Sequence, residues 1–211
     1  MMDLAAVQQA LGDGHSLPDA CLRKLEQFAA LVIKWNPSIN IVAKSTIGDL
    51  WSRHILDSIQ LFRCLTPDHK SWLDLGSGGG FPGMVIGILA SELRPDLRLG
   101  LVESDRRKSV FLMESSRQLG VPTVVHNCRI EDLAPQNACV VSARALAPLS
   151  MLCGYAARHV RLGGVCAFLK GASFEAEIEE ARKDWQFDLD RAESVTDSRA
   201  SILFLRGLRH V

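Results

Sequence analysis

The residues with the clearest chemical potential are a cluster of glycines and a glutamate that follows it in the sequence. The cluster, Gly76-Ser-Gly-Gly-Gly-Phe-Pro-Gly83, lies between a short apolar run and an apolar helical pattern. Gly76, Gly78 and Gly80 let a backbone turn sharply and approach a ligand closely, and the N–H groups of a helix beginning near Pro82 face the same space. Glu103 ends the next apolar run, where a carboxylate can accept both hydroxyls of a ribose. This pattern predicts a site for a nucleoside-containing ligand.

Two ligand classes fit this pattern. The glycine spacing from Gly78 to Gly83 matches the dinucleotide fingerprint, so a nicotinamide-dependent reductase is one reading. Asp74, two residues before the first glycine, can orient the loop or meet an ammonium group, whereas it would repel a pyrophosphate. S-adenosylmethionine has a ribose and an ammonium group but no phosphate, so the residues favour it as the cofactor.

The elements that must position these residues change in type along the chain. Residues 1–68 are predicted to be helical, with a first helix that Ser16 caps and Trp35-Asn-Pro37 ends, and a second after Ser45. From residue 69 short apolar runs alternate with helical patterns, which is typical of a parallel sheet. The runs at 186–189 and 201–205 are joined by a loop alone, so they predict an antiparallel hairpin. We therefore expect an α/β fold: a helical extension at 1–68, then one compact domain at 69–211 with a mostly parallel seven-stranded sheet.

Composition limits the classes of partner. The 211 residues carry no net charge, but residues 171–197 hold nine acids and three bases, which leaves 21 bases against 15 acids elsewhere. A basic face of that kind can hold a polyanion. No run approaches the ~20 apolar residues of a membrane span, and the six cysteines form no CxxC pair. We expect no membrane partner, no metal, reduced thiols and a cytoplasmic location.

Several ordered motifs resemble those of one family. Asp74-Leu-Gly-Ser-Gly-Gly-Gly-Phe-Pro-Gly83 is similar to the first motif of class I methyltransferases, in the variant found in the bacterial RsmG (GidB) family. Further matching segments are Trp35-Asn36 with Asn40, Arg53-His54-Ile-Leu-Asp57-Ser58, Glu103-Ser-Asp-Arg-Arg-Lys108, Arg129-Ile130-Glu131-Asp132 and Ser142-Ala-Arg144-Ala145. Together they cover nearly the whole chain.

The resemblance implies a fold, an activity and a binding site. The fold would be the Rossmann-like class I methyltransferase fold, and the activity methyl transfer from S-adenosylmethionine to N7 of a guanine in 16S ribosomal RNA, naked or in the small-subunit particle. A class I methyltransferase acting on another RNA, a protein or a small molecule is the alternative. The cofactor contacts implied by the family pattern are Gly76, Phe81, Ile130, Glu131 and Arg144.

Guanine N7 has a free lone pair, so this chemistry requires no general base. We therefore predict no catalytic acid or base and place Arg144 near the transfer point. His54 and Asp57 lie three residues apart on one helical face and could form a catalytic pair, but a structural lock, in which Arg53, His54 and Asp57 hold the N-terminal helices on the sheet, is at least as good an interpretation. The candidate RNA contacts are cationic: Arg53, Arg106, Arg107 and Lys108. For the last three, a solvated turn is an equal alternative.

Overall fold

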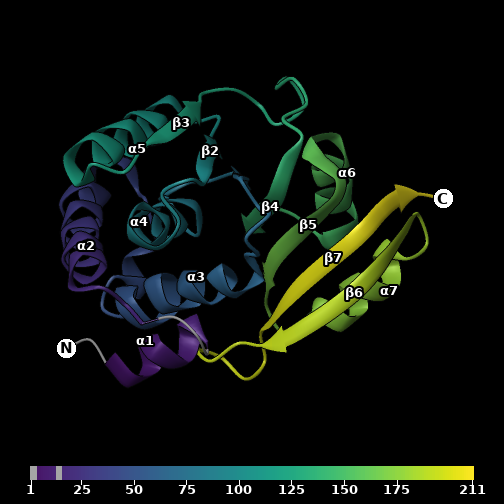
Figure 1. Ribbon diagram of the computed structural model, residues 1–211, viewed down its shortest axis with the longest axis horizontal. Coiled ribbons are helices and arrows are strands. Elements are labelled where there is room, and N and C mark those ends of the chain that lie inside the picture. The colour runs from purple at the N-terminus through teal and green to yellow at the C-terminus, as the bar shows by residue number, and fades with distance from the viewer. Residues whose placement is uncertain (1–3, 13–15) are drawn as a thin grey trace.

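Seven strands form one mixed sheet in the computed structural model, which describes residues 4–12 and 16–211 (Figure 1). The strand order is β3-β2-β1-β4-β5-β7-β6. β7 is antiparallel to both its neighbours, and the remaining pairs are parallel. The strands are β1 (Ser71–Leu75), β2 (Arg98–Val102), β3 (Thr123–His126), β4 (Ala138–Arg144), β5 (Val160–Lys170), β6 (Trp185–Glu193) and β7 (Ser201–His210). The predicted fold class and terminal hairpin are confirmed.

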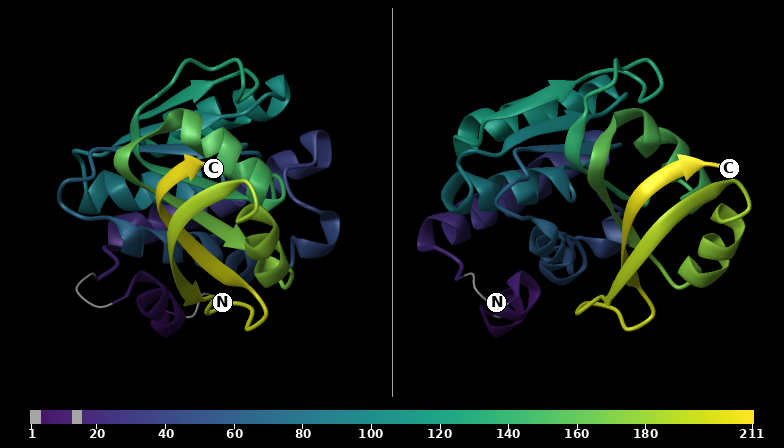
Figure 2. Two further views of the ribbon diagram at one scale, coloured as in Figure 1. Left: turned by 90° about the vertical axis from the view of Figure 1, so that its right-hand side faces the viewer. Right: turned by 45° about the vertical axis from the view of Figure 1, so that its right-hand side comes forward.

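Helices cover both faces of the sheet, because successive side chains of each strand point to opposite faces. In β1, Trp72 joins one buried apolar cluster and Leu73 and Leu75 join the other. The Trp72 cluster is completed by α1 (Leu4–Leu11), α2 (Asp19–Ile39), α4 (Gly83–Leu93) and α5 (Arg106–Leu119), and the other by α6 (Leu149–His159) and α7 (Phe174–Ala181). Figures 1 and 2 show the β6–β7 hairpin and α7 at one end of the molecule, and α2 and α5 at the other.

Helix α2 differs from the prediction at both ends. Its N-cap is Pro18 without a side-chain hydrogen bond, so the prediction that Ser16 caps it is wrong. The prediction that it stops before Pro37 is also wrong, since it continues to Ile39. Proline removes one hydrogen bond and disfavours the preceding residue's helical conformation. Here that cost falls in the last turn, where the buried Asn36 side chain accepts a hydrogen bond from the Val42 N–H at 2.8 Å.

The second predicted helical stretch is present, with an irregular pitch. A short 3₁₀ turn (Lys44–Thr46) is followed by a π-helical segment, η2 (Trp51–Leu56), then α3 (Asp57–Ile59) and a 3₁₀ turn, η3 (Gln60–Cys64). π-Helical turns are rare and often occur at functional sites. No helix in the described part of the chain is long and apolar enough to cross a membrane.

Candidate functional site

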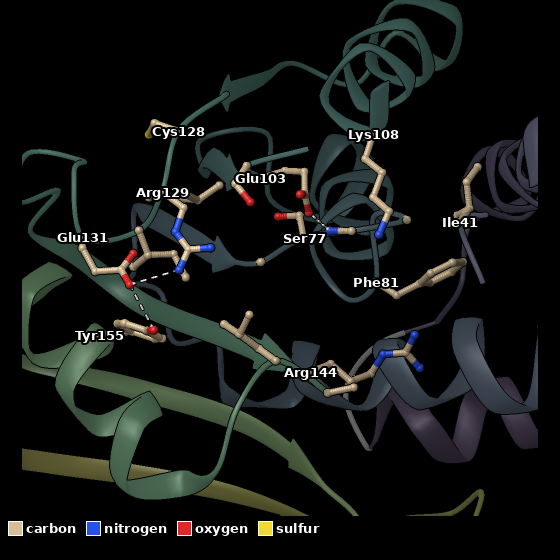
Figure 3. Close-up of a pocket in the computed structure, with 18 residues that line it drawn as sticks. Ile41, Ser77, Phe81, Glu103, Lys108, Cys128, Arg129, Glu131, Arg144 and Tyr155 are labelled. Carbon is tan, nitrogen blue, oxygen red and sulfur yellow. Dashed lines mark hydrogen bonds and ion pairs between the residues drawn. The ribbon is translucent and has the colours of Figure 1, made fainter. Parts of the chain in front are cut away.

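A cavity of about 360 Å³ lies across the carboxyl ends of β2, β1 and β4 (Figure 3). Its walls are the glycine loop after β1, the turn after β2, the loop after β3 and the turn after β4. Sequence-predicted residues that line it are Gly76, Gly78, Phe81, Glu103, Lys108, Ile130, Glu131 and Arg144. Gly80, Arg53, Arg106 and Arg107 are not among the lining residues.

Asp74 holds the glycine loop from beneath. Its side chain is fully buried, with Oδ2 accepting the Gly83 N–H at 3.2 Å and Oδ1 accepting the Ser142 hydroxyl at 2.6 Å. Burial raises the pKa of this carboxyl to about 6. Asp74 does not line the cavity. The expectation that it could orient the loop is therefore confirmed, and the expectation that it could contact an ammonium group of the ligand is wrong, because the carboxylate is fully buried.

Two glycines of the loop have different roles. Gly78 has a φ of 53°, and a Cβ there would have no neighbour closer than the Gly76 carbonyl oxygen, 3.7 Å away, so it borders open space. Gly80 has a φ of 86°, and its Cβ would lie 2.8 Å from Met84 Cβ and 2.9 Å from Phe28 Cζ. Gly80 thus allows the glycine loop to pack closely against α2 and α4, and it does not line the cavity.

Glu103 connects the loop to α5. It is only 8% exposed, and its Oε2 accepts the Gly78 N–H at 2.8 Å while its Oε1 accepts the Asp105 N–H at 2.7 Å. Each carboxylate oxygen has two lone pairs. Glu103, which lines the cavity, therefore keeps acceptor capacity for ligand hydroxyls.

The loop after β3 forms the far wall and is fastened to α6. The Ile130 carbonyl accepts a hydrogen bond from His159 Nε2 at 3.1 Å, and the Glu131 carboxylate accepts one from the Tyr155 hydroxyl at 3.1 Å. Tyr155, Arg129 and Ile41 line the cavity and were missed by sequence reasoning. Arg129 stood inside a quoted motif, but no signal places Ile41 or Tyr155 there, because they come from separate segments.

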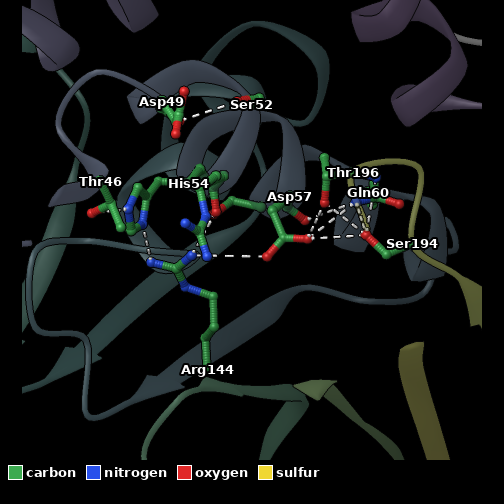
Figure 4. A network of polar contacts seen from close by, with 11 residues as sticks. Thr46, Asp49, Ser52, His54, Asp57, Gln60, Arg144, Ser194 and Thr196 are labelled. Atoms are coloured by element: carbon green, nitrogen blue, oxygen red, sulfur yellow. Dashed lines mark hydrogen bonds and ion pairs between the residues drawn. The ribbon is translucent and has the colours of Figure 1, made fainter. Parts of the chain in front are cut away.

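Arg144 is fixed by the π-helical segment (Figure 4). Its Nη1 donates to the Arg53 carbonyl at 3.0 Å, its Nη2 donates to His54 Nδ1 at 2.7 Å, and its guanidinium lies 5.3 Å from the Phe81 ring centroid. Because Nδ1 accepts this bond, His54 is neutral, and burial together with Arg144 lowers its pKa to about 4. The contacts agree with the structural reading of Arg53 and His54.

Asp57 ties the same segment to the connection between β6 and β7. Its Oδ1 accepts hydroxyl hydrogen bonds from Thr196 at 2.9 Å and Ser194 at 3.2 Å. Its Oδ2 lies 3.8 Å from Arg144 Nη1. Burial raises the pKa of Asp57. Asp57 is therefore a junction between the helical part, the sheet and the hairpin.

A second, larger cavity of about 860 Å³ adjoins Arg144 on the hairpin side. It shares Arg144 and Ala145 with the first cavity. Ala145 has a φ of 51°, and non-glycine residues in this strained region cluster at functional sites. Arg53, predicted as an RNA contact, lines this second cavity. No pattern in the sequence predicts this second cavity.

The remaining predicted RNA contacts lie at the start of α5. Arg106 is exposed, and Arg107 is exposed with a 3.6 Å ion pair to Asp105, whose side chain caps the helix. Lys108 is half-buried and faces the first cavity. The described residues contain no group of three or more His, Cys, Asp or Glu side chains arranged to hold a metal ion.

The family model and the relatives found by sequence agree on one family. The family model described as GidB, rRNA small subunit methyltransferase G, matches residues 21–204. A ribosomal RNA small subunit methyltransferase G from Cereibacter sphaeroides is 50% identical over 190 residues, covering 90% of this chain and 91% of the relative. One of the same name from Ruegeria sp. is 47% identical, covering 90% and 92%.

Solved structures share the fold at low sequence identity. A 16S rRNA N2 guanine methyltransferase (RsmC) from T. thermophilus, in complex with AdoMet and guanosine, has a TM-score of 0.52 at 18% identity, covering 71% of this chain and 38% of that one. The tRNA methyltransferase TrmI from Aquifex aeolicus has a TM-score of 0.51 at 13% identity, covering 67% and 62%.

Proposed function

Since this chain belongs to the rRNA small subunit methyltransferase G family, we propose that it transfers a methyl group from S-adenosylmethionine to N7 of a guanine in 16S ribosomal RNA. The observation that carries the proposal is the first cavity, built by the glycine loop and Glu103 at the carboxyl edge of the sheet. Ligands of open α/β sheets bind at this edge.

The residues of the cavity fit the cofactor. Gly78 leaves open space beside the backbone, Glu103 retains acceptor capacity for ribose hydroxyls, and Ile130 supplies a largely buried apolar wall. We assign Gly76, Gly78, Glu103 and the Ile130 segment to cofactor binding, with Phe81 and Arg144 at the β4 side of the cavity. The cofactor, when bound, supplies a methyl group activated by its sulfonium.

The protein's own contribution is orientation. Guanine N7 attacks with a lone pair it already has, so the reaction releases no proton at the nucleophile and requires no general base. Consistent with this, the imidazole of His54 is engaged by Arg144 and by the Thr46 hydroxyl at 3.0 Å. Holding two reactants at near-attack distance supplies a large part of such rate enhancements.

The substrate is 16S ribosomal RNA, naked or in the small-subunit particle, and the protein would act in the cytoplasm. N7 lies on the edge of the base that faces the major groove. In an A-form helix this groove is deep and narrow. The target guanine must therefore be exposed or moved out of its stack.

Methyl transfer to RNA tests the proposal. Purified protein is incubated with radiolabelled S-adenosylmethionine and either naked 16S RNA or small-subunit particles lacking the modification. We expect label in RNA, and chain cleavage by aniline after mild reduction at a single guanosine, as 7-methylguanosine requires. Label confined to protein or small molecules, or to a different atom of the base, would contradict the assignment.

A further inference from the structure

We propose that the side-chain ammonium group of Lys108 binds the α-carboxylate of S-adenosylmethionine and so fixes the amino-acid end of the cofactor. This inference rests on the proposed function and adds how the charge of that carboxylate is met. Lys108, predicted from the sequence as an RNA contact, is thereby assigned to the cofactor. It lines the first cavity from the start of α5.

The position of the ribose determines where the carboxylate lies. With the ribose hydroxyls at Glu103 and the adenine along the Ile130 segment, the amino-acid end of the cofactor lies on the opposite side of Glu103. In Figure 3, Lys108 lies on that side with Phe81 and Ile41, and its side chain extends from α5 toward the glycine loop.

This end of the cavity is closed by apolar contact with the segment after α2. A Cβ on Gly79 would collide with Ile41 Cγ2, so the chain at Ile41 packs directly on the glycine loop. The Phe81 ring, only 4% exposed, lies beside it. Charge pairs screened from water are stronger than exposed ones. A carboxylate placed here therefore requires a cation beside it.

The N-terminus of α4 does not supply that positive charge. A helix N-terminus attracts anions through its free N–H groups. In α4 the Gly83 N–H donates to Asp74 Oδ2 at 3.2 Å, and the Met84 N–H donates to the Gly80 carbonyl at 2.8 Å. The buried Asp74 carboxylate thus already takes the place of an anion, and it would repel a second carboxylate nearby.

The other cations that line the cavity are engaged with the protein. Arg144 donates to the Arg53 carbonyl and to His54, and Arg129 pairs with Glu131 at 3.4 Å on the far wall. Among the described residues, the Lys108 ammonium group has no hydrogen-bond or ion-pair partner. Partial burial of an unpaired charge carries a desolvation cost, which a bound carboxylate would offset.

Decarboxylated S-adenosylmethionine isolates this contact, because it keeps the adenosine, the sulfonium and the ammonium group and lacks only the carboxylate. Lys108→Met removes the charge and keeps an unbranched apolar chain, whereas Lys108→Arg retains a charge. Arg107→Met is the matched control, because Arg107 lies on the same turn of α5, is exposed and does not line the cavity. The measurements are affinity for both ligands by calorimetry, 16S RNA affinity by filter binding, and the unfolding temperature.

We expect wild type and Arg107→Met to bind S-adenosylmethionine at least about tenfold more tightly than its decarboxylated form, since hydrogen bonds between charged groups are strong ones. Lys108→Met should lose about tenfold in affinity for S-adenosylmethionine and change by less than about twofold for the decarboxylated ligand. Lys108→Arg should recover most of that loss. All variants should unfold at the wild-type temperature.

Equal losses for the two ligands in Lys108→Met would overturn the inference, because they would show a merely structural role. Wild-type affinity of Lys108→Met for S-adenosylmethionine, with weaker binding of 16S RNA, would also overturn it and assign Lys108 to the RNA. Both results leave the proposed function intact. If the wild-type protein binds neither ligand, the proposed function fails, and this inference fails with it.

Discussion

At the scale of single residues, Gly78 is where backbone conformation and ligand space coincide. Gly78→Leu should abolish S-adenosylmethionine binding, because its side chain would enter the open space beside the loop. Positive φ also costs a non-glycine residue about 1–2 kcal/mol. Gly120→Leu carries the same strain at a φ of 61°, in open space outside the cavity. We expect similar losses in the free energy of unfolding for both variants. A calorimetric titration that shows binding by Gly78→Leu would contradict this assignment.

His54 should make stability depend on pH in a defined direction. Its pKa is lowered to about 4, from 6.5 in the unfolded chain, chiefly by burial. The unfolded state therefore binds more protons between these values, and folding stability falls as the pH drops below 6.5. His54→Gln keeps an acceptor for Arg144 but does not titrate. Between pH 7 and pH 5, wild type should lose about 1 kcal/mol relative to this variant after allowance for solvent screening.

Urea unfolding of both proteins at each pH measures this difference. The buried Asp74, whose raised pKa acts in the opposite direction, is common to both and cancels. A difference that stays constant from pH 7 to pH 5 would show that His54 is not held neutral.

At the same scale, sequence reasoning identified residue types better than their contacts. The glycines and Glu103 were identified from their spacing, and Arg144 from the resemblance to the family's motifs. Asp74 was placed at the right position but given a contact with the ligand. The buried carboxylate of Asp74 accepts hydrogen bonds from Ser142 and Gly83. Ser142 lies beside it only because β4 pairs with β1 in the folded sheet.

At the scale of elements, α6 holds the far wall of the first cavity through one of its faces. Tyr155 donates a hydrogen bond to the Glu131 carboxylate, and Arg158 donates one to the Leu133 carbonyl at 3.1 Å. His159 donates one to the Ile130 carbonyl. Residues at these spacings share one side of a helix. The loop after β3, which has few regular backbone bonds of its own, is therefore positioned by a helix that follows β4.

His159→Leu should weaken cofactor binding without changing the chemical step. The Ile130 carbonyl would lose its donor, and one such hydrogen bond is worth about 0.5–1.5 kcal/mol. We expect KM for S-adenosylmethionine to rise roughly three- to tenfold and kcat at saturating cofactor to stay unchanged. His159→Gln, whose amide can donate, should recover most of the affinity. A fall in kcat with an unchanged KM would contradict a positioning role.

The elements themselves were largely predictable, and the exceptions have local causes. Alternating apolar runs and helical patterns gave the correct order from residue 71 onward, because their periods differ. The end of α2 was misplaced because Asn36 caps the exit with its side chain, a contact that the motif Trp35-Asn36-Pro37 does not reveal. The π-helical pitch of η2 has no sequence signal that we recognise.

At the scale of the whole molecule, charge is separated between α5 and α7, which lie at opposite ends of the molecule in Figure 1. We expect Arg106→Gln with Arg107→Gln to weaken RNA binding and to reduce its salt dependence by up to about two units, roughly one for each phosphate contact. Glu175, Glu179 and Glu180 changed to Gln should leave RNA affinity unchanged or slightly higher. Filter binding over a range of salt concentrations measures both.

Lys108 at the start of α5 and Glu177 in α7 are left unchanged in that experiment, because each has surroundings that the other charged residues do not share. Lys108 lines the first cavity, so its removal would also affect the cofactor. Glu177 accepts from the Leu149 N–H at 2.9 Å and pairs with Lys170, so it supports the start of α6. Loss of RNA binding in the glutamate variant alone would reverse our assignment of the faces.

The overall architecture was predictable to the level of the sheet but not of its edge. An antiparallel hairpin follows from a connection too short for a crossover. The sequence does not predict which strand of the hairpin pairs with the rest of the sheet, since both β6 and β7 have apolar runs. The second cavity was beyond sequence reasoning because it forms where residues 53–57, 144–145 and 194–201 meet.

The position of β7 between β5 and β6 has a consequence for synthesis on the ribosome. β6 emerges first, but its only neighbour in the sheet is β7, so it remains unattached until β7 has been made. Asp57 and Gln60, translated long before, likewise have partners at residues 194–195, in the connection that leads from β6 into β7. Domains generally fold as units as they emerge. In a nascent chain that ends before β7, β5 lacks its antiparallel neighbour, and residues 194–201 are not yet held against residues 53–57, so the sheet and the second cavity are completed only by the last strand to be made.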